Sequence, residues 1–242
     1  MEYKIIIQAR TGSSRLPGKV LIELVPGKTV LECLIDRLSF YVPKSNLIIA
    51  TITEVSDKKI LALADKLKIK AYAGSEQNVL ERYYQAAKQY DAKNIVRITS
   101  DCPLMDGELL RNMLQEFEHS QCDYLANVID RTYPRGLDIE IFQFTVLQEA
   151  YNKADEPAQL EHVTPYIHQH PEIFELKDYI NKRDLSDYRW TLDTKEDLAL
   201  IKAIYQNLYV ENNNFTTNDI LQLLDLKPEL IKLNAHIEQK KI

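Results

Sequence analysis

Short apolar runs rich in β-branched residues alternate with longer amphipathic segments through the first half of the chain. The runs at 3–8, 46–51, 69–73 and 94–99 predict strands, and apolar spacing of three and four predicts helices at 29–40, 56–67, 78–90 and 106–117. Thr29 and Glu32 form a capping-box pattern where the first helix begins. Strands joined through helices pair in parallel by right-handed crossovers, so the pattern predicts an α/β fold.

The pattern changes in the second half of the chain. Residues 136–142 alternate with period two, which predicts a half-exposed strand and therefore a mixed, mostly parallel sheet. A short strand is expected at 188–192, followed by a helix to about residue 208 and a tail at 216–242 with one or two helices separated near Pro228. Without repeats or a Gly/Ser linker, residues 1–242 are expected to form a single domain, with 216–242 as a C-terminal helical tail.

Composition excludes several classes of protein. The chain has 242 residues, 45% of them hydrophobic and 27% charged, which is typical of a globular domain. A formal net charge of −6 argues against a nucleic acid or an anionic membrane as partner. The apolar runs are too short to cross a bilayer or to form a signal peptide, and three cysteines have neither disulfide nor zinc spacing. We expect a cytoplasmic protein with reduced cysteines.

The charge is unevenly distributed along the chain. Between residues 3 and 22 the ionised side chains are four cations and no carboxylate, and two of the six glycines lie in the same segment. Glycines let a backbone approach an anion, turn amides donate to it and cations neutralise it, so the loop predicts phosphate binding. A solvated basic turn is the alternative. Five residues separate Gly12 from Gly18 and Val20 stands where a Walker loop has Ser or Thr, so the loop is of another type.

The segment at 9–19, ARTGSSRLPGK, resembles the signature of sugar nucleotidyltransferases, particularly the cytidylyltransferases that activate Kdo and sialic acid. The whole chain most resembles the SpsF-type branch. The resemblance implies a Rossmann-like, glycosyltransferase-A-type fold in which this loop wraps the triphosphate of CTP. It assigns phosphate contacts to Arg10 and Lys19, with Arg15 and the backbone amides assisting. The nucleotide-binding residues it implies are Ala9, Arg10, Thr11, Gly12, Ser13, Ser14, Arg15, Lys19 and Thr99.

Two carboxylates are candidates for a Mg²⁺ site. Asp101 follows the strand at 94–99, and Mg²⁺ prefers one or two protein carboxylates together with phosphate oxygens. An Asx-turn is the alternative for Asp101, and a helix cap paired with Glu196 is the alternative for Asp193. The resemblance makes Asp101 and Asp193 the metal pair, with Glu196 and Asp197 in support, and Arg10, Lys19 and Asp101 the catalytic set. Ser100 departs from the family's usual Gly before this Asp.

The segment at 127–142 is expected to determine which sugar binds. Asp138 and Glu140 are two residues apart on the predicted strand, so they point the same way and could grip sugar hydroxyls or an amino group, although an exposed polar strand face is the alternative. The resemblance to a Y-P-x-G-x-D-x-E segment assigns this region to the acceptor sugar. Leu160 stands where the family usually has Arg. The predicted sugar contacts are Arg131, Tyr133, Gly136, Asp138, Glu140 and His162, and Arg135 is a further candidate for a sugar carboxylate.

These predictions combine into one reaction. The chain is expected to transfer CMP from CTP to a hydroxyl of an acidic or amino sugar, releasing pyrophosphate, for surface polysaccharide biosynthesis. Mg²⁺ and the loop cations would neutralise the triphosphate. A nucleotide-sugar-dependent glycosyltransferase on the same fold and a non-catalytic nucleotide-sugar-binding protein remain alternatives. A homodimer is expected only by analogy with related cytidylyltransferases.

Overall fold

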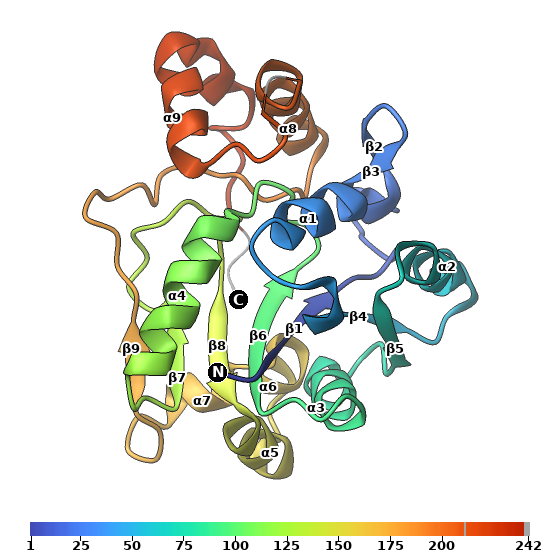
Figure 1. Cartoon of the computed structure of the whole chain (residues 1–242), viewed down its shortest axis with the longest axis vertical. Helices are drawn as coiled ribbons and strands as arrows, with labels where there is room; N and C mark the ends of the chain where they lie inside the picture. The colour runs from blue at the N-terminus through green and yellow to red at the C-terminus, as the bar shows by residue number, and fades with distance from the viewer. Residues whose placement is uncertain (211, 240–242) are drawn as a thin grey trace.

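A seven-stranded mixed sheet forms the centre of the computed structural model, which describes residues 1–210 and 212–239 (Figure 1). Its strand order is β5-β4-β1-β6-β8-β7-β9. The first half of the chain supplies four parallel strands: β1 (Tyr3–Gln8), β4 (Leu47–Ile52), β5 (Lys70–Gly74) and β6 (Asn94–Thr99). β8 (Glu140–Gln143) runs antiparallel to β6 and to β7 (Tyr124–Ala126), and β9 (Leu176–Asp178) runs parallel to β7. The predicted α/β fold with a mixed, mostly parallel sheet is confirmed.

Helices cover both faces of the sheet. One face carries α1 (Val30–Ser39), α2 (Lys58–Leu67) and α4 (Gly107–His119). α8 (Lys195–Leu208) and α9 (Thr217–Leu226) belong to the same hydrophobic core and pack against each other beyond the carboxyl end of β6 (Figure 1). The other face carries α3 (Val79–Gln89), α5 (Phe144–Lys153), α6 (Pro157–His162) and α7 (Pro165–Gln169). Short elements complete the chain: the hairpin β2 (Glu23–Val25) and β3 (Lys28–Thr29), and the 3₁₀ turns η1 (Lys19–Leu21), η2 (Lys44–Asn46), η3 (Val55–Asp57) and η4 (Pro228–Leu233). Among the described helices, none combines the length and apolarity needed to cross a membrane.

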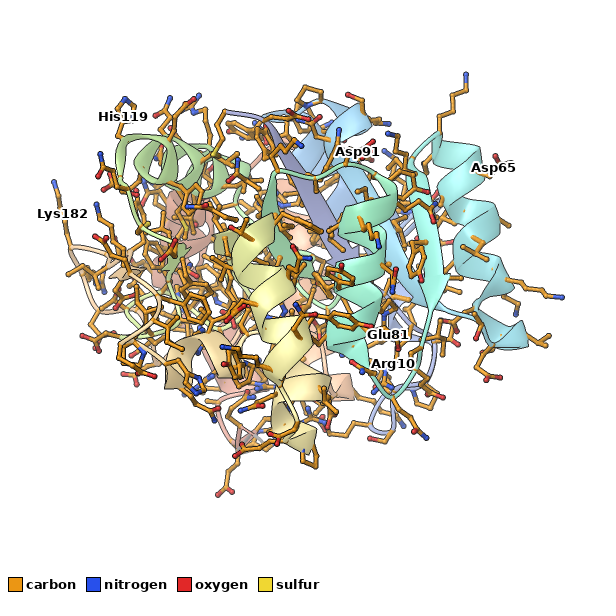
Figure 2. The ribbon with its side chains drawn as sticks, turned by 90° about the horizontal axis from the view of Figure 1, so that it is seen from below. Arg10, Asp65, Glu81, Asp91, His119 and Lys182 are labelled. Atoms are coloured by element: carbon orange, nitrogen blue, oxygen red, sulfur yellow. The ribbon has the colours of Figure 1, made fainter. Side chains whose placement is uncertain are left out.

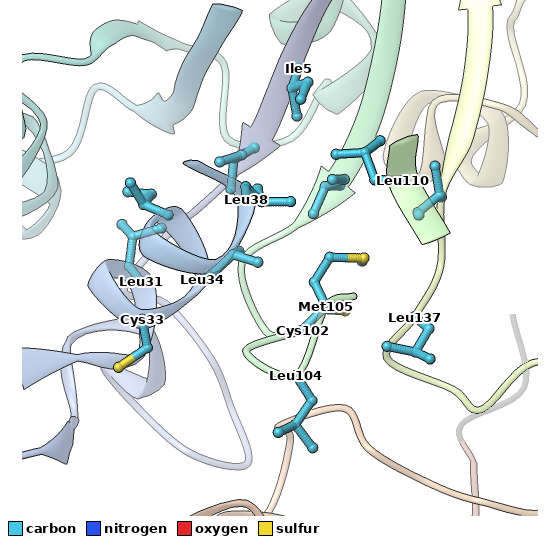
Figure 3. Close-up of a cluster of buried hydrophobic side chains, with 14 of the residues drawn as sticks. Ile5, Leu31, Cys33, Leu34, Leu38, Cys102, Leu104, Met105, Leu110 and Leu137 are labelled. Carbon is cyan, nitrogen blue, oxygen red and sulfur yellow. The ribbon is translucent and has the colours of Figure 1, made fainter. Parts of the chain in front are cut away.

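Alternation along the central strand explains the two cores. Ile5 and Ile7 of β1 face the side of α1 and α4, whereas Ile6 faces α3. Successive side chains of a strand point to opposite faces of the sheet, so one strand contributes to both cores. Figure 3 shows Cys102, Leu104 and Met105, which follow β6, in the same buried cluster as Leu34 of α1, so this segment is anchored in the first core. The loop that starts at Asp101 therefore begins from a rigid base at the carboxyl edge of the sheet.

Two strand predictions need correction. Of the predicted strand at 136–142 only 140–142 lies in β8, because the Asn127 side chain binds the backbone of Leu137 and Ile139 in place of a partner strand. The predicted strand at 188–192 is wrong, since only one isolated bridge joins Arg135 to Arg189. The predicted tail resolves into α9 and η4, which begins at Pro228, and its residues 240–242 lie outside the described residues.

Candidate active site

Most of the predicted nucleotide-binding residues line one cleft at the carboxyl edge of β1 and β6. The cleft has a volume of about 350 Å³. Figure 2 shows Arg10 close to Glu81, at the end of the sheet where α3 begins. Asp91 marks the opposite end of that helix. The cleft is lined by Gln8, Arg10, Gly12, Ser13, Ser14, Arg15, Lys19, Val20, Thr99, Ser100, Asp101, Glu161, His162 and Asp193. Ala9 and Thr11 are absent from this lining, and Ala9 is 1% exposed.

The loop after β1 is closed on itself by Thr11. The carbonyl oxygen of Thr11 accepts hydrogen bonds from the amides of Ser13 and Gly18, each at 2.9 Å. Gly18 has φ 68°, a left-handed conformation that glycine adopts without a steric penalty, and it turns the chain into η1. Lys19 is the first residue of η1. The closed turn thus aims Lys19 into the cleft, while the Ser13 amide is already engaged.

Lys19 lies between the two predicted metal carboxylates. Its ammonium donates to Oδ2 of Asp101 and to Oδ1 of Asp193, both at 2.8 Å, and its side chain is 12% exposed. Burial lowers the pKa of Lys19, but the two carboxylates outweigh burial and raise it above its ordinary value. Burial also raises the pKa of Asp101, while Lys19 and the Thr99 hydroxyl lower it overall. The pair stays ionised at neutral pH.

The Asp193 carboxylate does not cap α8, because the helix cap lies one residue later than predicted. Thr194 is the N-cap of α8 and forms a capping box with Asp197 instead of Asp193 with Glu196. The Asp193 carboxylate instead pairs with Arg15 at 2.8 Å and with Arg189 at 3.0 Å, in addition to Lys19. The capping alternative for Asp193 is therefore wrong.

Arg189 is a supporting residue that sequence reasoning missed. Its guanidinium makes two hydrogen bonds to Asp197, at 2.9 and 3.0 Å, beside the one to Asp193. Asn234, which follows η4, donates to Asp197 and to the Arg189 carbonyl oxygen. Segments far apart in sequence thus orient Asp193. The one local signal for Arg189 in the sequence is its position four residues before Asp193.

The donor set at this point suits Mg²⁺. Two carboxylates converge on one cation, and such ions take one or two protein carboxylates and complete their shell with phosphate oxygens and water. In the part of the chain that the structure describes, no group of three or more His, Cys, Asp and Glu side chains is placed to hold a metal. Asp101 and Asp193 could therefore hold a metal that enters with a nucleotide.

The predicted sugar residues do not gather in the same cleft. Of that set only His162 lines it. Asp138 makes two hydrogen bonds with Arg131, at 2.6 and 3.0 Å. Burial lowers the pKa of Arg131, but Asp138 outweighs burial and raises it. Gly136 has φ 105°, and a Cβ there would meet the backbone of Trp190 at 2.5 Å, so its glycine is explained by packing.

Glu140 is enclosed in the protein. It is 3% exposed, and it pairs with Arg97 and accepts from the hydroxyls of Tyr124 and Thr164, both at 2.6 Å. Burial raises the pKa of Glu140, but the Arg97 charge beside it lowers the pKa overall. The carboxylate is thus already provided with partners, and in this arrangement it stabilises the junction of β6 and β8.

A second cavity of about 640 Å³ adjoins the cleft. The two share Gln8, Arg10, Thr99, Glu161 and His162. Its other walls come from the start of α3, from Arg97 and from α6, where Leu160 presents an apolar side chain. The two cavities therefore lie side by side along these residues.

Comparisons with known proteins agree on one family. A family model described as "Cytidylyltransferase" matches residues 4–221. The spore coat polysaccharide biosynthesis protein SpsF of Bacillus subtilis is 33% identical over 93% of this chain and 94% of its own length. A cytidylyltransferase from Leptospira borgpetersenii superposes with a TM-score of 0.91 at 34% identity, covering 100% of both chains. A CMP:2-keto-3-deoxy-manno-octonic acid synthetase complexed with CTP shares the fold, with a TM-score of 0.65 at 18% identity over 85% of this chain and 99% of its own.

Proposed function

The chain belongs to the cytidylyltransferase family, and from that premise we propose that it transfers CMP from CTP to a sugar hydroxyl in the cleft beside Asp101. The observation that carries the proposal is the convergence of Lys19, Asp101 and Asp193 beneath the closed loop. It joins three cations, Arg10, Arg15 and Lys19, to a pair of carboxylates in one cleft. That combination suits a triphosphate and its metal better than an uncharged ligand.

The reaction in this cleft is a displacement at the α-phosphorus. The sugar hydroxyl loses its proton to water as its oxygen forms a bond to that phosphorus, the bond to the bridging oxygen of the β-phosphate breaks, and pyrophosphate leaves with the electron pair. Mg²⁺, when bound to Asp101 and Asp193, supplies charge neutralisation of the triphosphate. Arg10, Arg15 and Lys19 bind and orient the phosphates, and Arg189 keeps Asp193 in place.

The acceptor is proposed to occupy the adjoining cavity of about 640 Å³. The shared wall of Gln8, Thr99 and His162 supports this placement because it puts the acceptor next to the nucleotide. His162 keeps its proposed role as a sugar contact. Arg131, Tyr133, Gly136 and Asp138 can act on the sugar only from outside these two cavities, since none of them lines either one. A role in surface polysaccharide biosynthesis follows the printed description of SpsF and remains part of the proposal.

The test of the nucleotide is a thermal-shift screen with CTP, UTP, ATP, GTP, CMP-sugars and UDP-sugars, each with and without Mg²⁺. Stabilisation by CTP with Mg²⁺, followed by pyrophosphate release with a sugar, is expected. Stabilisation only by UDP-sugars would replace the proposal with a glycosyltransferase. CTP binding without turnover on a broad panel of sugar acids and amino sugars would favour the non-catalytic alternative.

The test of the site compares matched variants. Asp101→Asn and Lys19→Ala are expected to abolish Mg²⁺-dependent pyrophosphate release without unfolding the protein. Glu116→Gln and Lys177→Ala are the controls, because they break an ion pair of the same type on an exposed surface away from the cleft. Full activity in both site variants would overturn the assignment.

A further inference from the structure

Asp57 is a buried carboxylate with no part in the transfer proposed above. It is 0% exposed and lies at the end of η3, where it precedes α2. A buried carboxylate is costly unless donors surround it, so the identity of its donors shows what the charge is used for.

The donors to Asp57 come mainly from the phosphate loop and from β4. Its Oδ1 atom accepts from the Thr11 amide at 3.1 Å, from the Thr11 hydroxyl and from the Ser56 hydroxyl at 3.2 Å. Its Oδ2 atom accepts from the Thr51 hydroxyl at 2.7 Å. One carboxylate therefore joins the loop to a central strand through both polar groups that Thr11 can donate.

Thr11 is the residue on which the loop is closed. Its carbonyl oxygen holds the amides of Ser13 and Gly18, and Gly18 leads directly into Lys19. The amide and hydroxyl of Thr11 are turned toward Asp57, and the residue is absent from the cleft lining. A shift of Thr11 would move both ends of the loop, and with them the neighbouring Arg10 and Lys19.

We propose that Asp57 is a positioning residue that pre-organises the phosphate loop for the triphosphate, acting through Thr11 without touching the nucleotide. This rests on the proposed function, because it takes loop 9–19 as the phosphate site. Holding charged groups in place before binding removes the ordering cost from the binding step, and a misplacement of about 1 Å can cost about a hundredfold.

The test measures the dissociation constant of CTP with Mg²⁺ by calorimetry, alongside the melting temperature. Asp57→Ala is expected to weaken CTP binding by about tenfold to a hundredfold. Asp57→Asn is expected to restore most of the affinity, because its amide oxygen can still accept from Thr11 while its NH₂ group donates to the Thr51 hydroxyl. This rescue distinguishes a specific hydrogen-bond role from a loss of packing.

The chain offers a matched control in Asp106. This buried carboxylate also precedes a helix, α4, and accepts from the amide and hydroxyl of Thr217 at 2.8 and 2.7 Å. It ties α9 to α4 by the same chemistry without touching the loop. Asp106→Ala should therefore lower the melting temperature as Asp57→Ala does, but leave the CTP dissociation constant unchanged.

A second pair of variants covers the case in which Asp57→Ala does not fold. Thr11→Val removes the hydroxyl and keeps the shape, and it should weaken CTP binding, whereas Thr11→Ser should not. If the wild type does not bind CTP, the proposed function is wrong and this inference is wrong with it. If the wild type binds CTP and the Asp57→Ala and Thr11→Val variants that fold bind it equally well, or if Asp106→Ala weakens CTP binding as strongly, only this inference is wrong.

Discussion

Replacing Lys19 by Met would remove the ammonium that Asp101 and Asp193 share. Met keeps much of the apolar stem, so the change isolates the charge. The three side chains are 12%, 25% and 16% exposed, so solvent screens them only in part. Breaking a buried ion pair by removing one partner costs about 3–5 kcal/mol, whereas an exposed pair contributes about 0–1 kcal/mol.

The expected loss for Lys19→Met lies between these limits. Asp193 keeps Arg15 and Arg189 as partners, and Asp101 keeps the Thr99 hydroxyl, so neither carboxylate is left without a donor. We expect a loss of about 2 kcal/mol in the free energy of unfolding at pH 7. For a chain of this size that corresponds to a fall of about 4–8 °C in the melting temperature.

The pH dependence of this loss follows from the two pKa shifts. The pKa of Lys19 is raised in the folded protein, so its contribution is present below its unfolded value of about 10.4 and disappears as pH rises through the folded pKa. The pKa of Asp101 is lowered, so its contribution is present above about 3.9 and disappears as pH falls through the folded pKa. The difference between wild type and variant should be flat from about pH 5 to 9 and narrow on both sides.

Urea unfolding at several pH values, with and without Mg²⁺, measures both effects. Mg²⁺ alone should stabilise Lys19→Met more than the wild type, because in the wild type the ammonium already neutralises the two carboxylates. Equal stability of variant and wild type at pH 7, together with no stabilisation of the variant by Mg²⁺, would refute the reasoning.

Three further substitutions test other contacts. Gly136→Ala should cost more than about 2 kcal/mol, because the residue has positive φ and its Cβ would meet the Trp190 backbone, and a melting temperature within 1 °C of wild type (roughly 0.5 kcal/mol) would contradict this. Arg97→Met should cost about 3–5 kcal/mol at pH 7 by leaving buried Glu140 without its cation. The loss should be smaller at pH 4, because Glu140 takes up a proton at a higher pH in the variant than in the wild type, where Arg97 lowers its pKa, and urea unfolding at both pH values measures this. Arg189→Lys should reduce kcat for pyrophosphate release about tenfold to a hundredfold through misplacement of the Asp193 carboxylate, and unchanged kcat would contradict a positioning role for Arg189.

Local patterns were sufficient to predict much of the fold. Short apolar runs rich in β-branched residues identified the strands β1, β4, β5 and β6, and the capping box of Thr29 and Glu32 is present at the start of α1. Period two was misleading at 136–142, because the Asn127 side chain occupies backbone groups that a partner strand would need. Side-chain competition of this kind depends on a residue outside the segment, so no local pattern contains it.

The sequence by itself determined the fold class and the family, and it predicts a phosphate-binding loop, because these depend on residues close together in the chain. Only the tertiary structure decided that Lys19 lies between Asp101 and Asp193, which are 82 and 174 residues away. The capping box at the start of α8 is formed by Thr194 and Asp197 and not by the predicted Asp193 and Glu196, and Arg189 and Asn234 hold Asp197 in this position. The cause is physical: a buried charge is stabilised by whichever donors the packing brings to it, and those donors come from segments whose proximity only folding creates.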